Sequence, residues 1–127
     1  MHIAVVLVLI GLQVKHFAAD YLLQPKWMLA NKTNLAHPGG YLHALVHVAG
    51  SLIVLVLYGV AAVPMTLILV AEGLVHFAID YSQTRWAERH AGASNTWTFW
   101  AAHGTDQFLH QLTYVAVVYM AALFQFG

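Results

Sequence analysis

The chain has 127 residues, of which 61% are hydrophobic and only 8% are charged, and its mean hydropathy is +0.68. A soluble domain has roughly a quarter of its residues charged, so this composition excludes an ordinary soluble protein and predicts a membrane protein. A net charge of zero argues against nucleic acid as a partner, and the absence of cysteine excludes disulfides, thiolate metal sites and a cysteine nucleophile.

The first predicted membrane span covers about residues 3–23 and ends before Pro25. The start of the chain lacks the basic segment of a cleaved signal peptide, so we expect this span to be retained. It carries His16 and Asp20, which are four residues apart and therefore share one face of a helix. Lys15 lies off this face, and we expect it to snorkel or to pair with a neighbour.

A connection over residues 24–40 follows, and its segment near Trp27 has the composition of a short interfacial helix. The second span is predicted over about residues 41–63. It carries His43 and His47, again four residues apart, near its start. This repeated spacing indicates a second polar face on an otherwise apolar helix.

The third span is predicted over about residues 64–86, because Pro64 is suited to the first turn of a helix. Near its end the span carries His76 and Asp80 at the same spacing of four. Glu72 continues this stripe one turn deeper into the membrane. We expect Glu72 to act as a neutral acid or as an additional metal ligand.

A polar loop is predicted over residues 87–96, and the fourth span over about 97–126 carries Asp106 and His110 near its start. Each predicted span has about twenty residues or more, enough to cross roughly 30 Å of hydrocarbon. The sequence therefore predicts an all-α integral membrane protein, with one four-helix transmembrane bundle as a single domain over residues 1–127.

Lys and Arg residues are distributed unevenly between the predicted connections. The connection near residues 61–64 is short and uncharged, whereas the other two contain or adjoin Lys26, Lys32, Arg85 and Arg89. Because cytoplasmic loops of membrane proteins are enriched in Lys and Arg, we expect these two connections in the cytoplasm. Both termini are then predicted on the non-cytoplasmic side.

The four pairs are expected to converge on one side of the membrane. Two lie near the ends of their spans and two near the starts, and consecutive spans alternate in direction, so all should lie roughly 5–16 Å below the cytoplasmic boundary. Ionisable groups inside a membrane are costly and usually mark a functional site. The predicted metal ligands are His16, Asp20, His43, His47, His76, Asp80, Asp106 and His110.

Five imidazoles and three carboxylates are more than the roughly four to six ligands of one first-row metal ion. They predict two divalent ions, of zinc, iron or manganese, with an aspartate as a bridge. Other polar residues are expected to orient these ligands through hydrogen bonds. These residues are Gln13, Gln24, His103, Gln107 and Tyr114.

Two other interpretations use the same residues. Intramembrane His, Asp and Gln side chains can form a polar network that only holds helices together. Two histidines on facing helices can also bind haem iron, although a haem would leave the three aspartates unexplained.

At these residues the chain resembles a bacterial family of small membrane proteins, the domain-of-unknown-function family numbered 3307. The matching stretches are HFAADYLLQ from His16, WMLANK from Trp27, HALVH from His43, HFAIDY from His76 and DQFLH from Asp106. In one departure, a basic residue is expected soon after Asp80, and Arg85 follows only after four other residues. The resemblance implies a membrane location and the His/Asp sites, and it implies no activity.

The leading functional hypothesis is a multi-pass protein of the bacterial inner membrane that uses metal-bound water to hydrolyse a lipid-like substrate. Glu72 and Asp80 are its expected catalytic residues. The alternatives are a diiron or haem redox protein and a non-enzymatic metal or proton conduit or structural subunit. Membrane lipid and a homo-oligomer or larger membrane complex are the expected partners, and nucleic acid is not.

Overall fold

The computed structural model describes residues 2–126, which form five α-helices and one π-helix. These are α1 (His2–Phe17), the π-helix η1 (Ala18–Leu22), α2 (Lys26–Leu29), α3 (Gly39–Tyr58), α4 (Ala62–His90) and α5 (Trp97–Phe126). No strand occurs among the described residues. Four helical stretches, namely α1 with η1, α3, α4 and α5, are long and apolar enough to cross a membrane. The predicted all-α class with four membrane-length helices is therefore confirmed.

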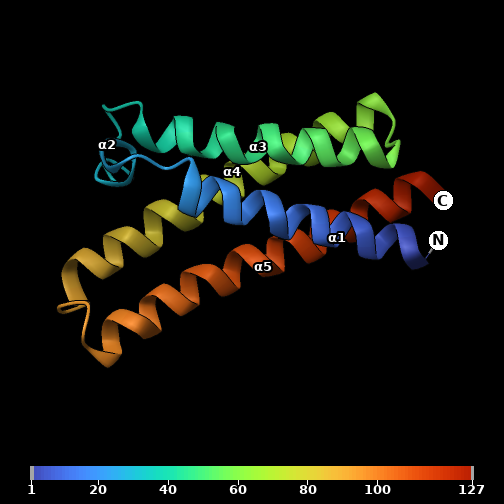
Figure 1. Ribbon diagram of the computed structural model, residues 1–127. Helices are drawn as coiled ribbons and strands as arrows, with labels where there is room; N and C mark the ends of the chain where they lie inside the picture. The colour runs from blue at the N-terminus through green and yellow to red at the C-terminus, as the bar shows by residue number, and fades with distance from the viewer. Residues whose placement is uncertain (1, 127) are drawn as a thin grey trace.

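The four long helices run alongside one another in alternating directions (Figure 1). Both termini lie at one end with the short α3–α4 connection, and the 23–38 connection and the 91–96 loop lie at the other end. Buried apolar side chains, including Leu12, Leu55 and Ala121, pack the half near the termini. Many large apolar side chains on the outer faces are exposed, as expected for helices that contact lipid.

The turn between α3 and α4 differs from the predicted boundary. α3 ends at Tyr58, before the predicted end at 63, because Gly59 adopts the left-handed conformation with a φ of 80°. A residue in this conformation terminates a helix, and glycine adopts it without steric cost. α4 then begins at Ala62, so that Pro64 lies within its first turn, where a missing N–H breaks no helical hydrogen bond.

The other connections also differ in part from the sequence prediction. α4 extends to His90, so the prediction of a loop over 87–96 is wrong for residues 87–90. Residues 87–89 are Ala, Glu and Arg, which favour a helix. The helix can therefore continue until shortly before Gly92, the first turn-forming residue that follows. The short helix expected near Trp27 is present as α2.

The π-helix η1 follows α1 directly and contains Asp20. Its backbone is wider than an α-helix, and the Leu23 N–H accordingly bonds the carbonyl of Ala18, five residues earlier, at 2.9 Å. Single π-turns are rare in proteins, and those that occur often lie at functional sites. Here the π-turn carries the one acidic residue of the first membrane-length helix.

Candidate metal centre

The structure brings the predicted His/Asp pairs into one cluster between the four long helices. Three overlapping groups among the described residues have ligand atoms within 4.8 Å of one another, and each group can hold a metal ion. They are His16, Asp20 and His47; His43, His47 and His76; and His76, Asp80 and His110. Seven of the eight predicted ligands therefore lie in geometrically suitable groups.

Asp106 is the predicted ligand that lies outside these three groups in the described part of the chain. Its Oδ1 atom is 3.6 Å from His110 Nε2, and its side chain is partly exposed at the edge of the cluster. The pair Asp106/His110 thus shares a helix face as expected. Asp106 lies beside His110 but outside the three groups of ligand atoms.

Asp20 contacts three imidazoles on two helices. Its Oδ1 atom lies 2.9 Å from His47 Nε2 and 3.2 Å from His43 Nε2, both on α3. Its Oδ2 atom lies 3.2 Å from His16 Nε2 on α1. The π-turn thus directs this carboxylate toward α3, where one oxygen is shared between two rings.

Asp80 has a similar environment on the other side of the cluster. Its Oδ1 atom lies 3.2 Å from His110 Nε2. Its Oδ2 atom lies 3.4 Å from both His43 Nε2 and His76 Nε2, and 3.1 Å from Lys32 Nζ. Lys32 comes from the connection before α3, so it supplies the basic partner that the sequence lacks directly after Asp80. His43 Nε2 lies between the two aspartates.

Glu72 Oε2, one turn deeper, is buried without a hydrogen-bond partner among the described residues. Among the eight predicted ligands, the atoms in this state are His76 Nε2 and Asp80 Oδ2. They are 3.4 Å apart, and the nearby nitrogens of His43 and Lys32 do not meet Asp80 Oδ2 with hydrogen-bond geometry. A buried polar atom without a partner costs about 1–3 kcal/mol, so such atoms normally have one. Converging nitrogen and oxygen atoms without a hydrogen bond are an arrangement that a bound cation would satisfy.

The imidazole rings are closely packed. The ring centroids of His47 and His76 are 3.8 Å apart, and those of His76 and His110 are 4.3 Å apart. His43, His47 and His76 are fully or almost fully buried. Rings packed this closely bring several ring nitrogens to one place, where a shared cation can bind them.

Three of the residues predicted to orient the ligands contact the cluster. Tyr114 Oη lies 2.8 Å from His16 Nδ1, and the Gln107 amide lies 2.8 Å from His16 Nε2 and 3.3 Å from Asp20 Oδ2. One orientation of the Gln24 amide accepts from Lys32 Nζ at 3.1 Å.

Gln13 and His103 make no hydrogen bond or ion pair with the eight predicted ligands in residues 2–126. His103 is exposed, and its ring packs against Trp100.

A buried ion pair lies one turn deeper than the cluster. Lys15 Nζ is 2.7 Å from Glu72 Oε1, and the Ser51 hydroxyl donates to the same oxygen at 2.7 Å. Lys15 also donates to the His47 carbonyl at 3.3 Å. A Cβ at Gly50 would lie 3.0 Å from the Lys15 Cβ, so glycine allows a close approach of α1 to α3. Of the two expectations for Lys15, pairing is confirmed. The roles of Glu72 as an acid or ligand stay predictions.

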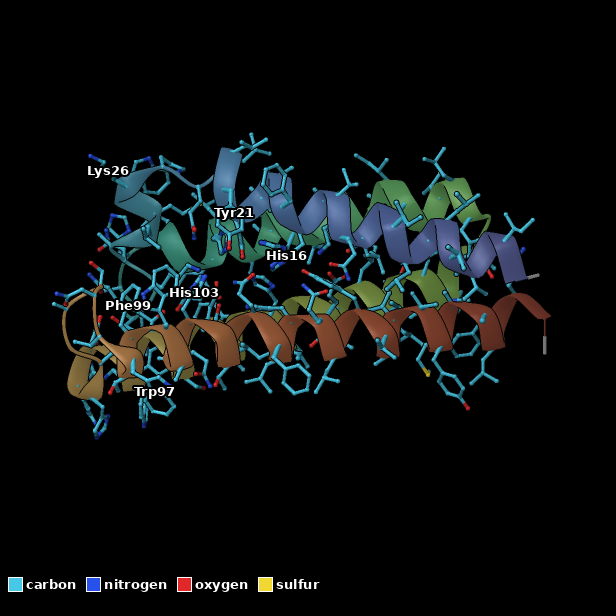
Figure 2. The ribbon with its side chains drawn as sticks, turned by 60° about the horizontal axis from the view of Figure 1, so that its bottom comes forward. His16, Tyr21, Lys26, Trp97, Phe99 and His103 are labelled. Carbon is cyan, nitrogen blue, oxygen red and sulfur yellow. The ribbon has the colours of Figure 1, made fainter. Side chains whose placement is uncertain are left out.

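A cleft of about 480 Å³ leads from the cluster to the surface, at the end opposite the termini. Asp20, Asp106 and Gln107 line it, together with Tyr21, Lys32 and Phe99. Figure 2 shows Phe99 and His103 of α5 facing the segment that carries His16 and Tyr21, whereas Trp97 lies on the other side of α5. The cleft makes part of the polar cluster accessible, and its size is within the usual range of small-molecule sites.

Comparison with known proteins agrees with the resemblance seen in the sequence. No curated protein and no solved structure matches the chain. One family model, described as "Protein of unknown function (DUF3307)", matches residues 8–126. This range contains every residue of the His/Asp cluster, the Lys15–Glu72 pair and the cleft. The chain therefore belongs to the DUF3307 family of proteins of unknown function.

Proposed function

We propose that this protein is a membrane metalloprotein that holds two divalent first-row ions in its His/Asp cluster and uses them to hydrolyse an amphipathic ester or phosphoester. The observation that carries the metal proposal is that the buried atoms His76 Nε2 and Asp80 Oδ2 converge without a hydrogen bond, although Lys32 forms an ion pair with the same Asp80 oxygen. A polar network that served only to join helices would be expected to pair such atoms.

The grouping of the ligands supports two ions. His16, Asp20 and His47 form one group, and His76, Asp80 and His110 form another that shares no residue with it. Each group offers two imidazoles and one carboxylate, and catalytic zinc sites typically have three protein ligands and one open position. His43 Nε2 lies 3.2 Å from Asp20 Oδ1 and 3.4 Å from Asp80 Oδ2, so this ring would be available as a further ligand to either ion.

Hydrolysis is the chemistry that such a pair of ions supplies best, because bound ions activate water and stabilise charge on the attacking and leaving oxygens. Asp80 would be the central anionic ligand. Glu72 would act as a positioning residue for His47. Glu72 pairs with Lys15, whose Nζ donates to the His47 carbonyl and lies 3.4 Å from His47 Nδ1. The cleft beside Asp20 and Asp106 would admit the substrate.

Protein purified without chelators is expected to contain about two first-row ions per chain, as dinuclear bundle sites do. Elemental mass spectrometry on the purified chain measures this ratio. A chain that contains little metal and takes up no zinc, manganese or iron would rule out the metal centre. It would leave the polar network as the function of the cluster.

The hydrolytic part of the proposal has a separate test. The metal-loaded protein should release nitrophenolate from 4-nitrophenyl butyrate or 4-nitrophenyl phosphate, and a chelator should stop the release. Full metal occupancy without any release would retain the metal centre and reject hydrolysis. An oxygen-dependent optical spectrum would then favour a diiron redox centre, because sets of two His and one carboxylate also bind iron.

We further propose that the protein resides in the bacterial inner membrane with both termini on the non-cytoplasmic side. Both connections at the cluster end contain or adjoin Lys and Arg, and the α3–α4 turn has neither. Reporter fusions after Gly127 and within the 91–96 loop should therefore report opposite sides, with the loop in the cytoplasm. Reports from the same side, or with the sides exchanged, would contradict this orientation.

A further inference from the structure

We infer that the cleft beside the His/Asp cluster binds the terminal phosphate of an anionic lipid, and that Lys32 is the side chain that recognises this phosphate. The inference rests on the proposed metal binding and names the substrate class of that site.

The walls of the cleft match an amphiphile. Asp20 and Asp106 contribute carboxylates to its lining, and Leu29, Phe99 and Ala102 contribute apolar surface. The exposed side chains of Trp27, Trp86, Trp97 and Trp100 belong to the helical segments that frame this end of the bundle, as residues of a membrane interface do. A molecule in the cleft can thus place a polar group at the cluster and apolar chains among the helices.

The charge of the cluster selects an anion once metal is bound. Two divalent ions carry more positive charge than the three aspartates neutralise, and Lys32 adds a further positive charge at the same place. A terminal phosphate carries close to two negative charges and three free oxygens. It can therefore contact both ions and an ammonium group together, which a carboxylate with two oxygens does less well.

Lys32 is placed to take part in this recognition. Its side chain is only 9% exposed, its Nζ lies 3.1 Å from Asp80 Oδ2, and it lines the cleft. An ammonium group has three donors. One orientation of the Gln24 amide accepts one of them, and Asp80 Oδ2 is an ion-pair partner without hydrogen-bond geometry, so Lys32 has a donor left for a ligand. A metal ion on Asp80 would also compete with Lys32 for the same oxygen and so release the ammonium group toward the cleft.

The test uses zinc-loaded full-length protein in a non-ionic detergent, with calorimetric titration of three probes. Dihexanoyl phosphatidic acid should bind at least about tenfold more tightly than dihexanoyl phosphatidylcholine and inorganic phosphate, because only it offers both a terminal phosphate and apolar chains. Lys32→Gln should weaken its binding by about tenfold or more and leave the zinc content unchanged, since a hydrogen bond to a charged group is lost. Lys26→Gln removes an exposed lysine outside the cleft and should change neither quantity.

Each of the following results would contradict one part of the inference. Equal affinity for phosphatidylcholine would overturn headgroup recognition, and equal affinity for inorganic phosphate would mean a free-anion site. Unchanged lipid affinity in zinc-loaded Lys32→Gln would overturn the role of Lys32. Zinc bound without lipid selectivity would overturn this inference alone, whereas a wild-type chain that binds no zinc would overturn the proposed function and this inference with it.

Discussion

Asp80→Asn is expected to reduce the metal affinity of the cluster by more than about 100-fold, because even residues that only support metal ligands contribute about 10–100-fold. The amide keeps the shape of the carboxylate but loses the negative charge that faces three imidazoles and Lys32. It also leaves a buried ammonium group without its ion pair. The metal-to-protein ratio of the purified variant, measured beside wild type by elemental mass spectrometry, checks this expectation.

Glu88→Gln is the matched control, because it makes the same acid-to-amide change at an exposed position on the same helix. It should retain the metal content of the wild type. Circular dichroism and elution as a single species should show that Asp80→Asn is folded. If both Asp80→Asn and Asp20→Asn retain full metal occupancy, the two aspartates are hydrogen-bonding residues and not metal ligands, and the proposed pair of His/Asp metal sites is wrong.

The second large effect concerns stability. Lys15→Met is expected to lower the free energy of unfolding by about 3–5 kcal/mol, because it leaves the Glu72 carboxylate buried without its ion pair. Glu72 is only 2% exposed, and Ser51 provides the remaining contact with its Oε1 atom. Unfolding of the purified protein in mixed micelles, followed by circular dichroism, measures the change.

Two control variants test whether the loss of stability comes from the unpaired buried charge. Lys15→Met combined with Glu72→Met removes both charges and should recover most of the lost stability. Arg85→Met breaks the exposed pair of Arg85 and Glu88, whose charged atoms are 3.8 Å apart, and should cost at most about 1 kcal/mol. A Lys15→Met variant as stable as Arg85→Met would mean that the buried pair contributes little to stability.

Helical periodicity explains how much could be predicted from the sequence. Residues four apart share a helix face, and alternating spans bring the starts and ends of neighbouring helices together. These two rules were sufficient to predict the convergence of His16, His43, His76 and His110, which the structure confirms. Tyr114 and Gln107 lie on the same face as His110 and were predicted for the same reason.

The contacts that periodicity does not describe were not predicted. Lys32 reaches Asp80 from an irregular connection, whose path depends on the packing of α2 against α3. Lys15 on α1 pairs with Glu72 on α4, and Gly50 of α3 leaves room for the Lys15 side chain. The π-turn at Asp20 has no sequence signal in this chain, since the flanking residues favour an ordinary α-helix.

The most direct measurement of the metal centre is anomalous X-ray scattering at the zinc edge from crystals of the zinc-loaded protein. We expect two peaks inside the cluster, one beside His16, Asp20 and His47 and one beside His76, Asp80 and His110. Their nitrogen and oxygen ligands should lie at roughly 2.0–2.2 Å. Fully loaded crystals with anomalous peaks only outside these residues, or a cluster whose His and Asp side chains bond solely to one another, would contradict the metal centre.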